Sequence, residues 1–199
     1  MARPRKFDEE RALDAAMRVF WERGYEATST QDLCDATGLG RSSIYNTFQS
    51  KHDLFERALV RYLDTMTLAQ TAVLDDVERP AAERVRALLT QVVESEAECR
   101  IGSGQALGCL GVNTVVELGA RDPGAAAMLE RDTARRLAAY RVVMEAGRRD
   151  GSITASRAPD ALARFLNATV AGLRVSSQGG AGRADLEAIA ETAMDAMVP

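Results

Sequence analysis

Histidine is almost absent from this chain, since His52 is the only one among 199 residues. The three cysteines, Cys34, Cys99 and Cys109, match neither a zinc motif nor a Cys-x-x-Cys pair. The glycine-containing stretch 100–105 lacks the Lys-Ser/Thr of a phosphate-binding loop. With no nucleophile–base motif either, the sequence predicts no enzyme, no cofactor and no metal ligand set. We expect His52 to be a solvated residue of a first helical turn.

Long apolar runs are also missing. The basic residues at the N-terminus are followed by acids rather than by the apolar segment of a secretory signal. No run approaches the roughly 20 apolar residues that a membrane-spanning helix needs. We therefore expect a cytoplasmic protein without a membrane partner, whose cysteines are reduced.

A surplus of positive charge is lacking too, because the net charge is −4. The acidic excess lies wholly after residue 62, and residues 1–62 hold ten basic and ten acidic residues. Binding to nucleic acid requires a basic patch rather than a basic protein. The cations in position to meet phosphate are Arg3, Arg5, Lys6, Arg41 and Lys51.

What the chain has in abundance is helical periodicity, with apolar residues recurring at i, i+3, i+4 and i+7. The pattern predicts an all-α protein of about nine helices, with an N-terminal three-helix domain and a C-terminal helical domain. Besides the short pair at 29–48, one helix is expected to begin at the cap Asp8 and another at the cap Ser50. The remaining expected helices cover about 81–98, 106–118, 124–149, 160–176 and 185–197. Residues 100–105 are expected to form a loop.

Residues 29–48 read as two short helices joined by a tight turn. Ser29 is a plausible N-cap, and Asp32 three residues on completes a capping box. Gly38 follows the first helix, where positive φ costs glycine nothing, and Gly40 can cap the second helix. The apolar residues expected to point inward are Leu33, Ala36, Ile44 and Phe48.

The outer face of the second short helix carries a cation, hydroxyls, a phenol and an amide: Arg41, Ser42, Tyr45 and Asn46. These groups read phosphates and base edges in a major groove. The pair is therefore a candidate helix-turn-helix. Lys51 starts the next helix, where backbone N–H groups and the side-chain cation can share one phosphate.

The N-terminal 60 or so residues resemble the DNA-binding domain of the tetracycline-repressor (TetR) family. The matching run comprises ALDAAMRVF at 12–20, GYEAT at 24–28, the helix pair, Ile44-Tyr45 and Phe48-x-Ser50-Lys51. The resemblance implies a DNA-binding domain at 1–62, an effector-binding and dimerisation domain at 63–199, and a homodimeric repressor that leaves a palindromic operator when a small ligand binds or a cysteine is modified. The implied DNA contacts are Arg3, Arg5, Lys6, Thr28, Thr30, Arg41, Ser42, Ser43, Tyr45, Asn46 and Lys51.

Two features depart from the common family pattern. Gly40 replaces the usual hydroxyl cap, and Asn46-Thr47 stands where histidine or aromatic residues are common. Residues 1–6 fit either a basic arm on DNA or a disordered terminus. A further alternative for the chain is a helical ligand-binding or adaptor protein with a vestigial DNA-binding domain.

The last two helices resemble the family's dimeric four-helix bundle. Each has one apolar face for the monomer core and a second face of small and apolar residues, rimmed by Arg164 and Arg174. The expected interface residues are Arg164, Ala168, Gly172, Leu173, Ile189 and Met194.

The middle helices are where the family's effector pocket would lie. Cys109, Asn113 and Glu117 are spaced to share one helical face, and the Gly-Cys-Leu start resembles family branches whose cysteine senses electrophiles, oxidants or a soft metal. Simple packing of a buried thiol is the alternative. The candidate effector or sensing residues are Cys99, Cys109, Asn113, Glu117, Met128 and Met144.

Overall fold

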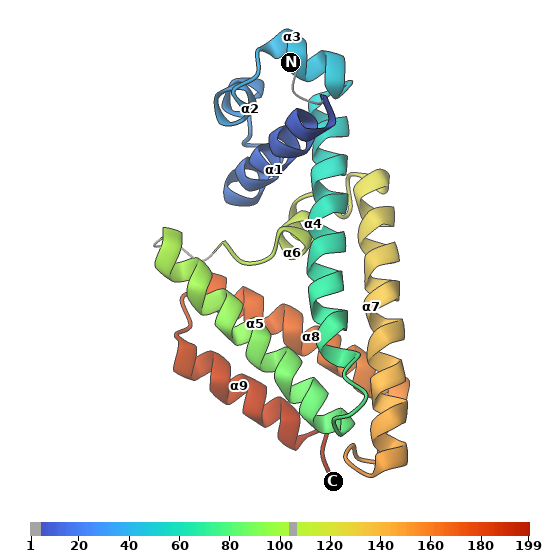
Figure 1. Ribbon diagram of the computed structural model, residues 1–199. Coiled ribbons are helices and arrows are strands. Elements are labelled where there is room, and N and C mark those ends of the chain that lie inside the picture. The colour runs from blue at the N-terminus through green and yellow to red at the C-terminus, as the bar shows by residue number, and fades with distance from the viewer. Residues whose placement is uncertain (1–4, 104–106) are drawn as a thin grey trace. The chain divides into compact units, whose positions relative to one another are not determined.

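The computed structural model describes the backbone of residues 5–103 and 107–199 and the side chains of 9–98 and 107–199. The described chain is all-α, as predicted, with nine helices and no strand (Figure 1). Within it, no helix is long and apolar enough to cross a bilayer. The helices are α1 Arg5–Arg23, α2 Thr30–Thr37, α3 Arg41–Thr47, α4 Lys51–Leu74, α5 Ala81–Ser103, α6 Leu110–Leu118, α7 Pro123–Asp150, α8 Pro159–Gln178 and α9 Arg183–Asp195.

The helices form two compact units, and α4 and α7 each pass from one to the other. The first unit combines the chain up to Asp64 with Leu110–Leu129, so α6 joins α1, α2, α3 and the start of α4. Aromatic rings contact one another in this unit: Phe20 packs edge-on against Phe55, with ring centroids 5.2 Å apart, and Trp21 packs edge-on against Tyr62.

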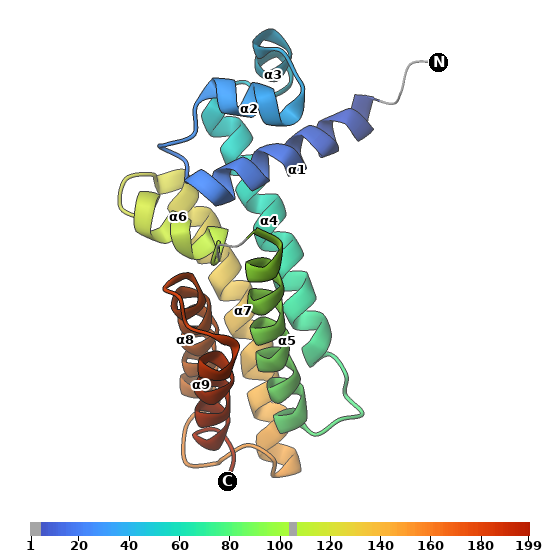
Figure 2. The ribbon, with the colours of Figure 1, turned by 90° about the vertical axis from the view of Figure 1, so that its left-hand side faces the viewer.

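The second unit consists of Thr65–Cys109 and Glu130–Pro199. In it α5, α8 and α9 pack on one another, and α8 and α9 lie side by side in Figure 2. Their buried faces and that of α7 make one hydrophobic core around Leu88, Tyr140, Leu166 and Leu186. The apolar periodicity of α8 indicated the buried positions Leu162, Leu166 and Val170, but not the exposure of Phe165.

Three helix boundaries were predicted wrongly. α1 begins at Arg5, so Asp8 lies inside it and is not its cap. α5 continues to Ser103, through Gly102, because a single glycine costs a helix only about 1 kcal/mol and does not force it to end. α6 begins at Leu110 instead of 106, because Gly108 adopts a left-handed φ of 64°, which an α-helix cannot include.

Candidate nucleic-acid interface

The turn between α2 and α3 is fixed by local signals at both ends of α2. The N–H of Asp32 donates to Ser29 Oγ at 3.1 Å and the N–H of Ser29 donates to Asp32 Oδ2 at 2.8 Å, which is the expected capping box. The hydroxyl of Ser29 also donates to Asp32 Oδ2 at 2.7 Å, and this bond, followed by that from the Ser29 N–H, lowers the pKa of the Asp32 carboxyl. At the other end Gly38 has φ 69°, and its N–H donates to the carbonyl of Cys34. Gly40 then starts α3 with extended backbone and no side-chain cap bond.

The inward residues of the pair are Leu33, Ile44 and Phe48, all fully buried as expected. Ala36 was also expected inside, but it is exposed. α2 has only eight residues and buries a single apolar side chain, Leu33, so its buried face is too narrow to include Ala36. The pair is therefore held mainly by three anchors, one on α2 and two at α3.

The outward face of α3 is polar, as predicted: Arg41, Ser42, Ser43, Tyr45 and Asn46 are all exposed. The hydroxyl groups of Tyr45 and Thr30 share a hydrogen bond of 3.2 Å, which joins α3 to the start of α2. The guanidinium of Arg41 lies 5.9 Å from the centre of the Tyr45 ring. The hydrogen bond from Thr30, followed by that from Arg41, lowers the pKa of the Tyr45 phenol.

Lys51 begins α4 and extends its ammonium over the ring of Tyr25, 4.4 Å from the centroid. The second capping box is only half formed. Ser50 Oγ accepts the N–H of Asp53 at 3.0 Å, but Asp53 accepts the N–H of Gln49 rather than that of Ser50. Lys51 thus stands in the first turn of a capped helix.

Not every expected DNA contact lies on this face. Thr28 is buried, and its hydroxyl donates to the carbonyl of Gly24 at 2.6 Å, so its side chain supports the turn after α1. Arg5 and Lys6 belong to the first turn of α1 by their backbone, but their side chains lie outside the described residues. Arg3 lies outside the described residues altogether.

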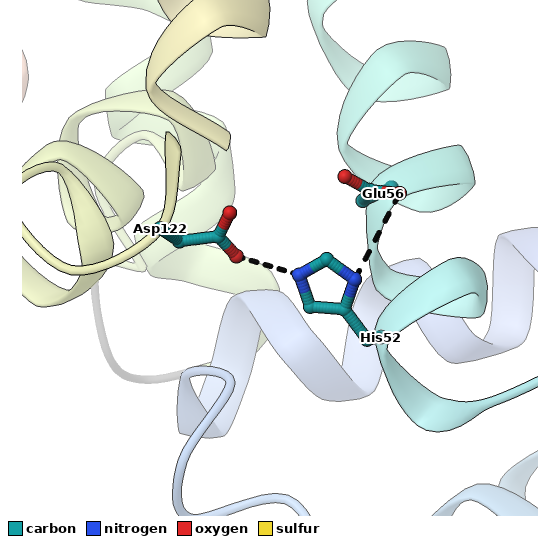
Figure 3. Close-up of side chains that lie close together, drawn as sticks. All are labelled: His52, Glu56 and Asp122. Carbon is teal, nitrogen blue, oxygen red and sulfur yellow. Dashed lines mark hydrogen bonds and ion pairs between the residues drawn. The ribbon is translucent and has the colours of Figure 1, made fainter. Parts of the chain in front are cut away.

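Two side chains in the first unit make long-range contacts that sequence reasoning missed. Glu117 of α6 accepts the N–H groups of Tyr25 and Glu26, at 3.0 and 2.8 Å, and so holds the turn after α1. His52 was expected to be a solvated residue, but its Nε2 lies 2.6 Å from Oδ2 of Asp122 (Figure 3). That contact is the main cause of a lowered pKa of the Asp122 carboxyl. No spacing signals pairs that are 70 or more residues apart.

The expected effector residues lie in different surroundings. Cys109 precedes α6, because the left-handed Gly108 delays the helix start, so of the three residues expected to stack only Asn113 and Glu117 lie within the helix. Cys109 is buried in the second unit, where Nη1 of Arg174 donates to its sulfur at 3.0 Å. The other candidates are scattered: Asn113 and Met128 are half-buried, Met144 is in the core of the second unit, and the side chain of Cys99 lies outside the described residues.

The expected interface residues on α8 and α9 divide in two. Arg164, Ala168, Gly172 and Ile189 are exposed, whereas Leu173 and Met194 are buried in the core. Arg174, expected on the rim, is buried as well. The sequence analysis missed two exposed apolar side chains of α8: Phe165 is 42% exposed and Val175 is 51% exposed. Leu173 and Met194 were misplaced because one position along a helix turns a side chain by about 100°.

An all-α chain whose second short helix presents a polar face from a capped turn defines a helix-turn-helix regulatory protein. Comparison with known protein families identifies the family to which the chain belongs. Residues 12–58 match bacterial regulatory proteins of the tetR family, and residues 81–195 match the tetracyclin repressor-like C-terminal domain. The chain belongs to the TetR family, which is a family of transcriptional regulators.

Individual relatives agree with this assignment. The transcriptional repressor ComR of Escherichia coli is 31% identical over 192 residues, covering 96% of this chain and 90% of ComR. A cysteine mutant of the TetR family regulator CifR, complexed with double-strand operator DNA, is 32% identical with a TM-score of 0.80 and covers 98% of this chain and 100% of its own. The reduced form of Escherichia coli NemR, at 20% identity and a TM-score of 0.85, covers 97% of this chain and 98% of its own and shows the shared fold.

Proposed function

We propose that this protein is a homodimeric repressor that binds a palindromic operator in double-stranded DNA and leaves it when an effector acts on the second unit. The observation that carries the proposal is the outer face of α3, on which all five polar side chains are exposed. ComR is named a transcriptional repressor, and the CifR mutant was solved on operator DNA, which supports the same role here. DNA as the partner makes the cytoplasm the place of action.

The exposed groups divide into two roles by chemistry. A guanidinium, two hydroxyls and an amide can bond base edges, which assigns direct readout to Arg41, Ser42, Ser43 and Asn46. Phosphate contacts fall to Tyr45 on the same face and to Thr30 and Lys51, which begin α2 and α4. The hydroxyl groups of Thr30 and Tyr45 bond each other, so both can contact the same stretch of DNA backbone. Such contacts would orient α3 on the DNA without distinguishing one base from another.

The effector step is assigned to Cys109 and its surroundings. The thiol is buried, and Nη1 of Arg174 donates a hydrogen bond to its sulfur. Addition of the sulfur to an electrophilic quinone carbon, with the thiol proton passing to the reduced ring oxygen, would place a bulky group in a packed core. A non-covalent ligand in the second unit is the alternative, and release of DNA by quinone in the wild type but not in Cys109→Ser would distinguish the two.

The test of DNA recognition is selection of random duplexes by the purified protein, followed by titration of the recovered site at several salt concentrations. We expect a palindromic site. Arg41→Ala should cost about 1–3 kcal/mol at one or two base positions. Lys51→Ala should weaken binding to every sequence and reduce the salt slope by about one. Arg148→Ala, which removes an exposed charge at the end of α7, is the matched control.

Two results would contradict the proposal at different levels. Equal, sequence-independent losses in Arg41→Ala and Lys51→Ala would refute the division between base and phosphate contacts. Failure to enrich any sequence at moderate salt would refute DNA binding itself.

A further inference from the structure

Three ligand-type side chains of the first unit converge in Figure 3: His52 in the first turn of α4, Glu56 one turn later, and Asp122 just before α7. Nε2 of His52 is 2.6 Å from Asp122 Oδ2, and Nδ1 is 3.8 Å from Glu56 Oε2. One ligand atom from each residue can be chosen so that all lie within 4.8 Å of one another. Their side chains are 43%, 28% and 14% exposed, so the group is open to ions from solvent.

The two carboxylates face the same small space beside Gly124. A Cβ atom built on Gly124 would lie 2.5 Å from Glu56 Oε1 and 3.2 Å from Asp122 Oδ1. Two negative charges that converge in this way repel each other unless a positive charge lies between them. The neighbouring imidazole offers a lone pair on one nitrogen when it is neutral.

The carboxylate of Asp122 is held in place for such a role. Its Oδ1 accepts the N–H groups of Gly124 and Ala125, at 2.9 and 3.1 Å, which leaves Oδ2 directed at His52. The ring of His52 also packs edge-on against Tyr25, with centroids 6.0 Å apart. Metal ligands oriented by a second set of contacts bind their ion more tightly than mobile ones.

We propose that His52, Glu56 and Asp122 bind a divalent cation of the zinc type. An imidazole nitrogen with carboxylate oxygens suits Zn²⁺, and three protein ligands leave one tetrahedral position for water. At zinc bond lengths of about 2.0–2.2 Å, tetrahedral ligand atoms lie about 3.3–3.6 Å apart. Binding through Nε2 therefore requires the histidine and Asp122 to separate by about 1 Å. It also requires the side chain of Glu56, which now faces Nδ1 (Figure 3), to change rotamer and reach the Nε2 side of the ring.

The ion would take the place of the direct contact between Nε2 of His52 and Oδ2 of Asp122. It would tie the start of α4, which carries Lys51, to the turn before α7. The site thus makes the DNA-binding unit responsive to a cation, independently of whether Cys109 responds to an electrophile.

The single histidine makes the test direct, because the imidazole nitrogen signals of the untagged protein report on one residue only. The experiment titrates Zn²⁺ into ¹⁵N-labelled protein in which all three cysteines are replaced by serine, without DNA. We expect a saturable 1:1 shift of the Nε2 signal and a rise in the unfolding midpoint. Glu56→Gln and Asp122→Asn should each weaken binding at least tenfold, and asparagine at 122 keeps the acceptor that caps α7.

Glu22→Gln removes an exposed carboxylate of α1 in the same unit and should bind Zn²⁺ like the parent protein. By calorimetry, His52→Gln should show no binding of that affinity. No shift of the imidazole signal at tenfold excess of Zn²⁺ would overturn the proposal. An equal shift in Glu56→Gln and Asp122→Asn would overturn it too, since it would mean adventitious binding to a lone imidazole. Neither outcome bears on operator binding.

Discussion

At the scale of single residues, burial decides how Tyr140 behaves. Its ring is fully buried in the second unit, and its hydroxyl donates to Oε1 of Gln70 at 2.8 Å. Desolvation raises the pKa of this phenol from 10.0 to about 12. Because the folded pKa lies above the unfolded one, this contribution to stability is complete below pH 10 and is lost as the pH rises toward 12.

Tyr140→Phe tests that assignment. Near neutral pH it should lower the free energy of unfolding by about 1–3 kcal/mol, because Gln70 loses a buried partner. Above pH 10 the wild type should lose stability faster than the variant, as followed by thermal unfolding across pH 8 to 11. Parallel curves for the two proteins would show that the phenol ionises freely in the folded state.

A substitution of Glu117 can distinguish a role in stability from the effector-sensing role predicted from the sequence. Its carboxylate accepts two backbone N–H groups of the turn after α1, and bonds to a charged acceptor contribute about 1.5–3 kcal/mol each. Glu117→Ala should therefore lower the free energy of unfolding, measured in urea melts, by more than about 1 kcal/mol. This value is below the sum for two buried bonds because the edge of the turn is exposed to solvent. An unchanged stability with an altered effector response would instead support the sensing role predicted from the sequence.

At the scale of elements, the turn between α2 and α3 depends on backbone conformation at one position. Gly38 has φ 69° with no atom near its open side, so Gly38→Ala adds strain without a clash and should destabilise by about 1–2 kcal/mol. Gly40 has φ −68° and equally open surroundings, which makes Gly40→Ala the matched control with a cost below 1 kcal/mol. Equal costs in chemical denaturation would contradict the strain argument.

The same turn shows what a sequence can reveal. The capping box of Ser29 and Asp32 and the left-handed Gly38 were predictable, because each signal lies within a few residues of its partner. The contacts of His52 with Asp122 and of Cys109 with Arg174 join residues 65 or more positions apart, which no periodicity encodes. The assignments of Leu173 and Met194 failed since helices with two apolar faces do not reveal which face meets the monomer core.

At the scale of the whole molecule, the remaining question is what covers the outer face of α8 and α9. On α8 the residues Phe165, Ala168, Gly172 and Val175 follow a 3-4-3 spacing, which is the spacing of a helix seam. Phe165, Val175 and, on α9, Ile189 are 42%, 51% and 38% exposed in the single chain. Gly172 leaves open space above its backbone, so a second helix can approach closely there.

The proposed repressor would cover this face with a second copy of the chain, because a palindromic operator needs two recognition helices related by a two-fold axis. If the proposed dimer forms through this face, Phe165→Glu should yield a monomer in light scattering, while Val142→Glu, on the exposed side of α7, should leave the dimer intact. Loss of the second half-site contact should weaken operator binding by about 10²–10⁴-fold, the usual gain from linking two binding modules. A Phe165→Glu variant that stayed dimeric and kept full operator affinity would show that the interface lies elsewhere. A variant that became monomeric and kept that affinity would show that one recognition helix is enough, and a palindromic site would then have no physical basis.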